Sequence, residues 1–184
     1  YGTLTVTTAT RGYAFTKNTA LIESLDDGET RTDSFSVTVT DGKSTPVIQT
    51  FTVTVTGADD APTLAAVTEG AIAEVDQSLA TNDSGLGGTL SGSDVDVETL
   101  VYGIVDGTVS GDSLSVTKTG TYGMLTVVRG SGAYSFAKNA SAIEALDASA
   151  QVTQTFSVTV SDGDHGVVQR DYVIRLTGAD DAAT

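Results

Sequence analysis

Carboxylates are the side chains of this 184-residue sequence that gather in a way that could do chemistry. Twenty-four Asp and Glu face nine Lys and Arg, so the formal net charge is −15. The carboxylates concentrate at Asp59-Asp60, at Glu69, at Asp94 and Asp96, and at Asp162 and Asp164, with Asp41 as an earlier counterpart of Asp162. Two carboxylates at 4 Å repel by about 1 kcal/mol in water and about 4 kcal/mol at a surface-like dielectric, so such groups favour a shared cation or proton.

Calcium is the cation that this donor set suits best. Ca²⁺ takes roughly six to eight oxygen ligands in flexible geometry, and backbone carbonyls can complete its shell. We interpret Asp59, Asp60, Glu69, Asp94 and Asp96 as metal ligands. Asp41-Gly42 and Asp162-Gly163 are interpreted as turns, because Asp-Gly pairs occur in turns for local reasons. No EF-hand loop is present.

Catalysis is not expected from these residues. The single histidine, His165, lies in a predicted turn, and the matching position in the repeat described below is Ser44. Paired carboxylates could act as acid and base in glycoside hydrolysis. That reaction needs a sugar cleft lined with aromatic side chains, whereas the sequence has no Trp, six Tyr and five Phe. We therefore predict no catalytic residues, and no cofactor besides Ca²⁺.

Composition excludes several classes of partner and points to β-structure. The acidic charge excludes general nucleic-acid binding, which needs Lys and Arg. The absence of Cys rules out a disulfide scaffold. No stretch approaches the ~20 apolar residues of a membrane span, and neither end resembles a signal peptide, so we expect a mature or internal segment, or export by a route that leaves no N-terminal mark. Abundant Thr, Val, Ser and Gly favour an all-β protein.

The elements that must position the carboxylates repeat with a period of 121 residues. Tyr1–Val6 recurs as Tyr122–Val127, and Phe35–Val39 recurs as Phe156–Val160. The same offset, with no gap, matches Tyr13 to Tyr134, Phe15 to Phe136, Asp41-Gly42 to Asp162-Gly163 and Gly57–Ala61 to Gly178–Ala182. Such a period predicts an array of similar domains, cut in mid-repeat.

Three segments follow from this period. Residues 1–60 are predicted to be the C-terminal half of a β-sandwich repeat, 61–181 a complete repeat, and 182–184 the start of the next linker. Half a sandwich would expose an apolar face and sheet edges. Either the chain is therefore a piece of a longer one, or another molecule supplies the missing strands.

Alternation of apolar and polar residues predicts the strands. They are expected at Leu4–Thr8, Tyr13–Thr16, Thr32–Thr40, Val47–Thr56, Thr63–Val67, Ala71–Val75, Thr89–Ser91, Thr99–Val105 and Leu114–Thr117, with the first half-repeat pattern returning from Tyr122. No strand is predicted in the Gly-, Ser- and Asn-rich stretch 76–88. The phase of Tyr13 with Phe15, and of Tyr134 with Phe136, places these aromatic rings in the core. The pattern predicts Greek-key β-sandwiches.

One short helix is predicted in each repeat. Residues 18–25 break the alternation, and Asn18 is suited to cap a helix. An alternative use of Lys17 and Lys138 is an isopeptide bond with Glu23 or Glu144.

Four stretches resemble one known family. Thr56–Pro62, read Thr-Gly-Ala-Asp-Asp-Ala-Pro, is similar to the junction of VCBS repeats and related cadherin-like domains in large bacterial surface proteins. Ser91–Asp96, Thr121–Val127 and Val158–Gly163 are similar to the same family. The resemblance covers essentially the whole chain. It implies tandem Ig/cadherin-like β-sandwiches in long, secreted, adhesin-like chains, often exported by type I secretion.

The resemblance also implies how calcium is bound. Cadherin-like domains use a Glu after the first strand, an Asp-x-Asp loop and an acidic linker, which here would be Glu69, Asp94 with Asp96, and Asp59 with Asp60. The linker reads Ala-Asp-Asp-Ala rather than the fuller cadherin pattern Asp-x-Asn-Asp-Asn. The second copy, Asp180-Asp181-Ala182-Ala183, lacks the Pro.

The sequence therefore predicts a structural spacer of a bacterial adhesin or extracellular filament, with Ca²⁺ at the junctions between repeats. Neighbouring repeats or neighbouring subunits are the expected partners. Two alternatives remain open. One is an adhesion module that binds a surface glycan or protein receptor, through residues 76–93 or 106–121. The other is a subunit that polymerises by strand complementation.

Overall fold

The computed structural model describes residues 1–96, 98–164 and 166–180. The chain forms two compact units. Unit 1 is Tyr1–Asp60 with Val95–Val97, and unit 2 is Ala61–Asp94 with Glu98–Thr184.

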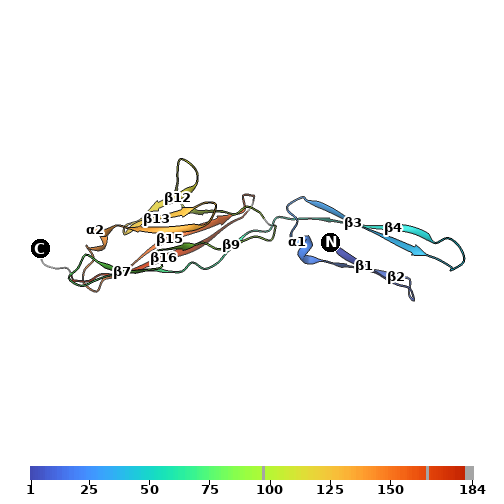
Figure 1. Cartoon of the computed structure of the whole chain (residues 1–184), viewed down its shortest axis with the longest axis horizontal. Helices are drawn as coiled ribbons and strands as arrows, with labels where there is room; N and C mark the ends of the chain where they lie inside the picture. The colour runs from blue at the N-terminus through green and yellow to red at the C-terminus, as the bar shows by residue number, and fades with distance from the viewer. Residues whose placement is uncertain (97, 165, 181–184) are drawn as a thin grey trace. The chain divides into compact units, whose positions relative to one another are not determined.

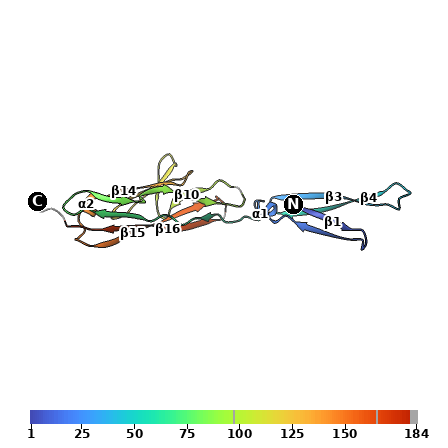
Figure 2. The same cartoon turned by 60° about the horizontal axis from the view of Figure 1, so that its bottom comes forward.

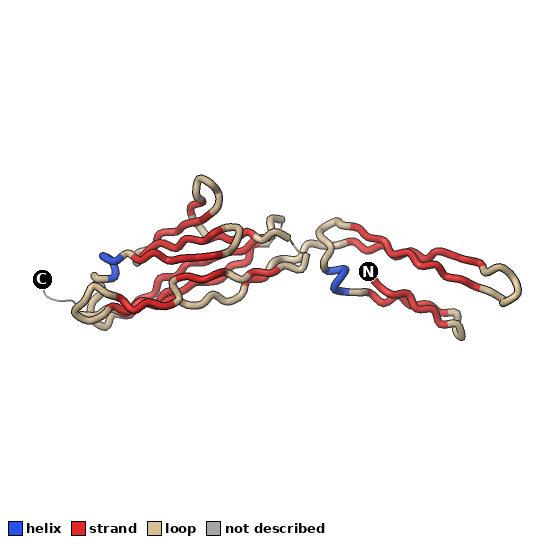
Figure 3. Tube along the Cα trace, viewed as in Figure 1, coloured by secondary structure: helices blue, strands red, loops and turns tan. Residues whose placement is uncertain are grey.

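Unit 1 contains two antiparallel hairpins. They are formed by β1 (Gly2–Thr7) with β2 (Gly12–Lys17), and by β3 (Thr30–Val39) with β4 (Val47–Thr56) (Figure 3). These bounds agree with the strands predicted from alternation. Short polar turns join the strands within each hairpin, as expected for runs bounded by Gly, Asp and Ser.

Unit 2 contains two five-stranded sheets. In the first, the order is β10 (Val101–Ile104), β15 (Gln151–Ser161), β16 (Val167–Thr177), β6 (Gly70–Glu74), β7 (Thr81–Ser84). In the second, it is β11 (Thr108–Val109), β12 (Ser115–Thr119), β13 (Gly123–Val128), β14 (Ala133–Lys138), β8 (Gly87–Thr89). A short pair joins β5 (Thr63–Leu64) to β9 (Gly92–Ser93). The described pairs are antiparallel except β16 with β6.

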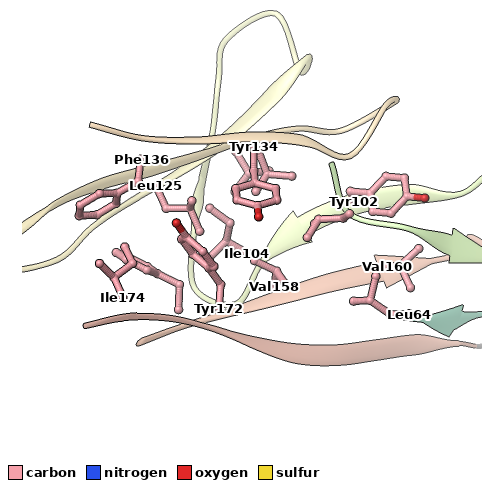
Figure 4. Packing of buried hydrophobic residues seen from close by; sticks show 14 of the residues in the cluster. Leu64, Tyr102, Ile104, Leu125, Tyr134, Phe136, Val158, Val160, Tyr172 and Ile174 are labelled. Atoms are coloured by element: carbon pink, nitrogen blue, oxygen red, sulfur yellow. The ribbon is translucent and has the colours of Figure 1, made fainter. Parts of the chain in front are cut away.

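The core of unit 2 lies between these sheets. Figures 1 and 2 show β13 and β14 in one layer and β15 and β16 in the other. Leu125 on β13 and Val158 on β15 point into the space between the sheets (Figure 4). Both residues, and Val127 on β13, are essentially inaccessible to solvent. Two ring contacts add directional packing. The centroids of Tyr134 and Tyr172 lie 5.1 Å apart, and those of Phe136 and Phe156 5.9 Å apart. Unit 2 is therefore an all-β sandwich, as predicted.

The repeat seen in the sequence is also a repeat of structure. Strands β1 and β2 pair in the same register as β13 and β14, so Gly2 opposes Lys17 as Gly123 opposes Lys138. Likewise, β3 and β4 pair in the register of β15 and β16. The 121-residue offset thus conserves both the strands and their hydrogen-bonded partners.

A one-turn helix follows the first hairpin of each half, as predicted. In unit 1, α1 (Thr19–Glu23) starts after Asn18, whose Oδ1 accepts a hydrogen bond from the Leu21 amide at 3.3 Å. In unit 2, α2 (Ala140–Ile143) follows Asn139, whose side chain instead donates to the carbonyl of Thr121. In the described residues, no helix is long and apolar enough to cross a bilayer.

The junction glycines are explained by close backbone approach. A Cβ on Gly57 would lie 2.3 Å from the carbonyl oxygen of Leu25, and one on Gly178 would lie 2.4 Å from that of Asp147. In both copies, the glycine amide donates a hydrogen bond to the loop after the helix, to Glu29 in one and Ala150 in the other. The glycine of each Thr-Gly-Ala-Asp-Asp run therefore lets its strand pass tightly against that loop.

Several details of the strand prediction were wrong. Strand β9 was not predicted, and β5 ends at Leu64 rather than at Val67. Strand β7 lies inside the stretch 76–88, where no strand was predicted, and β11 was also missed. Strand β8 begins at Gly87, two residues before the predicted start. Strands β7, β8 and β11 are short and lie at sheet edges, where one neighbouring strand suffices and strong apolar alternation is not required.

The predicted burial of Tyr13 was also wrong. Its repeat counterpart Tyr134 is 7% exposed in unit 2, as expected for a core residue, whereas Tyr13 is 66% exposed. Phe15 is half-buried and its counterpart Phe136 is buried. The phase of alternation is the same in both units, but the face that carries Tyr13 is not covered as it is in unit 2.

Candidate metal centre

The five residues predicted to bind metal are divided between the two units. Asp59, Asp60 and Asp96 belong to unit 1, and Glu69 and Asp94 belong to unit 2. All except Glu69 are half-buried. Within unit 1, the amide of Asp60 donates a hydrogen bond of 2.8 Å to Oδ2 of Asp96. The linker and the Asp-x-Asp loop are therefore linked directly in that unit.

Glu69 is engaged by an arginine. Its Oε2 accepts from Nε of Arg175 at 2.7 Å, and its Oε1 accepts from an Nη of the same guanidinium at 3.0 Å. The hydrogen bonds from Arg175 lower the pKa of the Glu69 carboxyl, and Glu69 in turn raises the pKa of Arg175. Both side chains are largely exposed, so the pair is a surface ion pair of bidentate geometry. To bind a cation, Glu69 would have to leave Arg175.

Glu98 lies near two other carboxylates of unit 2, Asp162 and Asp164. One carboxylate oxygen of Glu98 lies within 4.8 Å of an oxygen of Asp162, and within the same distance of an oxygen of Asp164. Asp162 is only 8% exposed and follows the long strand β15. Glu98 was not among the predicted ligands, and Asp162 was predicted to lie in a turn.

Asp162 does form the predicted turn, but it is also buried. Its Oδ1 accepts hydrogen bonds from the amides of Asp164 at 3.0 Å and Gly166 at 3.2 Å. A Cβ on Gly166 would lie 2.5 Å from the other oxygen, Oδ2, and 2.5 Å from Cδ of Pro62. The carboxylate therefore lies close to the first residues of unit 2, beside Ala61-Pro62.

A sequence signal for Asp162 exists in the strand itself. Phe156, Val158 and Val160 occupy alternate positions of β15 and are buried, and Asp162 continues the same phase. A carboxylate on the buried face of a strand is uncommon unless it is paired or binds a metal. The counterpart Asp41 is exposed and forms a turn, because its Oδ1 accepts from the amides of Lys43 and Ser44 at 2.9 Å. These hydrogen bonds, chiefly the one from Lys43, lower the pKa of the Asp41 carboxyl.

The donor set of unit 2 fits a hard cation. Glu98, Asp162 and Asp164 present only carboxylate oxygens, and the sequence has no Cys. Oxygen-only sites suit Ca²⁺, Mg²⁺ or Mn²⁺, whereas zinc and copper sites use imidazole or thiolate. His165, which was predicted to lie in the turn after β15, is outside the described residues.

The second copy of the junction contacts other acidic and polar residues of unit 2. The amide of Ala179 donates to Oε2 of Glu74 at 2.9 Å. The Gln77 amide donates to the carbonyl of Asp180 at 2.8 Å, and its Nε2 donates to Oδ2 of the same residue at 3.2 Å. Glu74 ends strand β6 and was not among the predicted ligands. The remainder of this junction, including the start of the linker assigned to 182–184, lies outside the described residues.

Lys138, one of the two lysines considered for isopeptide bonds, forms an ion pair in the structure. Nζ of Lys138 forms an ion pair with Oδ2 of Asp83 at 2.6 Å and also contacts Oγ1 of Thr81. Lys138 ends β14 and Asp83 lies on β7, so the pair joins the two sheets of the sandwich. The interaction of Lys138 is thus a salt bridge across the sandwich.

The sheets of unit 2 define a β-sandwich protein with an acidic site. Comparison with known proteins adds structural neighbours only. No model of a protein family matches the chain, and no curated protein matches it.

Among solved structures, the chain is similar to Protocadherin Gamma B2 extracellular cadherin domains 3-6, with 14% identity and a TM-score of 0.42 over 96% of this chain and 39% of that one. It is also similar to Protocadherin Gamma B2 extracellular cadherin domains 1-5, with 12% identity and a TM-score of 0.42 over 99% of this chain and 32% of that one. The Protocadherin GammaB4 extracellular domain gives 17% identity and a TM-score of 0.42 over 97% of this chain and 26% of that one. The chain thus spans well under half the length of each neighbour.

Proposed function

We propose that this chain is a structural spacer made of tandem β-sandwich repeats, from a bacterial cell-surface adhesin or extracellular fibre, with junctions stiffened by Ca²⁺. The observation that carries the proposal is the repetition of β1–β4 as β13–β16 in the same registers. The repeated half contains no insertion that could carry a separate binding loop. A gapless repeat of this kind adds length to a chain.

The proposed division of the chain follows the same offset. Residues 1–60 correspond to the trailing half of a repeat, and 61–181 to a complete repeat. The bacterial and secreted parts of the proposal come from the VCBS-like stretches Thr56–Pro62, Ser91–Asp96, Thr121–Val127 and Val158–Gly163. The partners in this role are neighbouring repeats or subunits, and the role requires no catalysis.

Calcium binding is proposed for the sequence-assigned acids together with two found in unit 2. The set is Asp59, Asp60, Glu69, Asp94 and Asp96, with Glu98 and Asp162 added. A bound Ca²⁺ would neutralise neighbouring carboxylates and tie together the segments that bear them. The convergence of Glu98 and Asp162, one of them buried, supports the site, because Ca²⁺ prefers carboxylate oxygens as ligands.

The test is the thermal stability of the whole chain in Ca²⁺ and in chelator. Extracellular calcium modules have dissociation constants of about 10⁻⁴–10⁻³ M, so about 10 mM Ca²⁺ should stabilise the bound state by roughly 1.4–2.7 kcal/mol. We expect a rise in Tm of several degrees without a change in mass by light scattering. Replacing both Asp59 and Asp60 with Ala, or Asp162 with Asn, should remove that rise.

Control variants distinguish the loss of a calcium ligand from the mere loss of negative charge. Asp106→Ala with Asp171→Ala removes the same charge as the junction double variant and should keep the calcium response. Two further variants, Glu69→Gln and Glu98→Gln, test the two glutamates separately. Glu69 is bound by Arg175, whereas Glu98 lies near Asp162 and Asp164. We expect the larger loss of calcium affinity from Glu98→Gln, and the reverse order would favour the original assignment of Glu69. A calcium response that survives in the junction and Asp162 variants would reject the site.

A further inference from the structure

Two asparagines of the chain stand in the pattern Asn-x-Ser, in which x is any residue except Pro. They begin the runs Asn82-Asp83-Ser84 and Asn139-Ala140-Ser141. This pattern is the acceptor for transfer of a sugar to an asparagine side chain, a modification of surface segments in secreted proteins. The structure places the two runs in different surroundings.

Asn139 has a structural reason to be asparagine. It directly precedes α2, and its Nδ2 donates a hydrogen bond to the carbonyl of Thr121 at 3.2 Å. Its repeat counterpart Asn18 also precedes a short helix, but the run Asn18-Thr19-Ala20 does not complete the pattern. Ser141 lies inside α2, where residues two apart do not face each other. The helix start thus accounts for Asn139 and separates it from the serine.

Asn82 lies instead in the extended backbone of β7. Residues two apart in a strand share a face, so Asn82 and Ser84 point to the same side. The opposite face carries Thr81 and Asp83, and both of these contact Nζ of Lys138 on β14. The amide of Asn82 and the hydroxyl of Ser84 are therefore presented together, on the side of the strand away from Lys138.

This side of β7 is exposed and uncrowded. Asn82 and Ser84 are both exposed, and their partners on β6 are the small residues Ala73 and Ala71. Strand β7 is also the last strand of its sheet (Figure 1). A sugar on Asn82 would therefore meet small side chains on one side and a free sheet edge on the other.

We propose that Asn82 is an N-glycosylation site, whose donor is a nucleoside diphosphate sugar. In the transfer, Nδ2 of Asn82 forms a bond to the anomeric carbon of the sugar. The bond between that carbon and the phosphate oxygen breaks, the nucleoside diphosphate leaves, and the amide nitrogen loses one proton. This inference goes beyond the spacer role and does not depend on calcium binding.

The test is transfer of glucose to the folded, full-length chain. The chain is incubated with uridine diphosphate glucose and a purified soluble enzyme that glucosylates Asn-x-Ser/Thr, and its peptides are then analysed by mass spectrometry. We expect at least about tenfold more hexose on Asn82 than on Asn139, because Asn139 must first leave the start of its helix.

Substitutions check that the pattern itself is recognised. Asn82→Gln and Ser84→Ala should both abolish the hexose at position 82, whereas Ser84→Thr keeps the hydroxyl and should retain it. All three positions changed are exposed, so the variants should keep the Tm of the original chain. Loss of hexose in Ser84→Ala without a change in Tm then reports on recognition and not on unfolding.

Two synthetic peptides, of residues 78–88 and 135–145, show how the enzyme treats each run without the fold. The ratio of hexose between the two asparagines in the folded chain is compared with the ratio between the peptides. Absence of hexose from Asn82 in the folded chain would overturn the proposal, whether or not the first peptide is modified. So would equal ratios in chain and peptides, because the strand would then play no part.

Discussion

At the scale of single residues, Asp162 shows how one local motif serves two environments. Asp41 and Asp162 both precede a glycine at positive φ, and both accept backbone hydrogen bonds within a turn. Only Asp162 is buried and has a second carboxylate, Glu98, within 4.8 Å. The turn chemistry is local, whereas the acidic site is formed by segments more than 60 residues apart.

Tyr172 should make the folded state sensitive to high pH. Burial raises its pKa to about 12, and the neighbouring Tyr134 adds to this shift. The folded state thus holds the proton that the unfolded chain loses near pH 10. The stabilisation is complete below about pH 10 and is lost as the pH rises through about 12, by roughly 2–3 kcal/mol. Urea unfolding of unit 2 between pH 9 and 12 measures the fall.

The control for this prediction is Tyr172→Phe. It removes the hydrogen bond from the Tyr172 hydroxyl to the carbonyl of Gly85, so it should be less stable than the original at neutral pH. Its stability should change less between pH 10 and 12, because Phe does not titrate, whereas Tyr134 keeps the pKa that burial raises. Parallel profiles for the two chains would show that another group is responsible.

At the scale of elements, the two junction glycines allow the strand before each of them, β4 or β16, to lie close to the loop that follows the helix of its unit. A Cβ at Gly178 would lie 2.4 Å from the carbonyl oxygen of Asp147 and 2.8 Å from Cβ of Leu146. Gly178→Ala should therefore displace the loop after α2 and destabilise unit 2 by about 1–3 kcal/mol, the usual effect of overpacking. Denaturant unfolding of the full chain measures the change.

Gly130→Ala is the matched control for this element. Gly130 lies in the turn between β13 and β14, and a Cβ there would meet nothing within 4 Å. We expect a change of less than about 0.5 kcal/mol, as at ordinary surface positions. If Gly178→Ala were equally mild, close approach would not be the reason for glycine at the junction.

At the scale of the whole molecule, one repeated sequence occurs in a closed and an open setting. Phe156 is 2% exposed in unit 2, and its counterpart Phe35 is half-buried in unit 1. Phe156→Ala should destabilise its unit by about 3–5 kcal/mol, since it removes a large side chain from a packed core. Phe35→Ala should have a clearly smaller effect, because less apolar surface is buried there.

Hydrogen exchange resolves the two effects within one chain. The Phe156 variant should accelerate exchange from β15 and β16, and the Phe35 variant from β3 and β4 only slightly. Equal acceleration by the two variants would mean that unit 1 is as well packed in solution as unit 2, which would contradict its open face.

Much of the fold follows from short-range patterns. Alternation gave the hairpins of each half, Asn18 marked the start of α1, and the 121-residue offset predicted that β13–β16 would reproduce β1–β4. The edge strands β7 and β11 were not predicted, because they are short and largely polar, and each pairs with one neighbouring strand. The candidate site was less predictable, since Glu98 carries no local signature.

The amino-acid sequence by itself determines the period, the strand phases and the turns, because these depend on residues that are close along the chain. Only the tertiary structure decides that Asp162 is buried beside Glu98, that Glu69 binds Arg175, and that Tyr13 is exposed while Tyr134 is buried. The physical reason is that alternation sets which side chains share a face. Whether that face is buried depends on which other strands cover it. In unit 2, strands from residues 61–121 cover it, and this segment occurs once in the sequence.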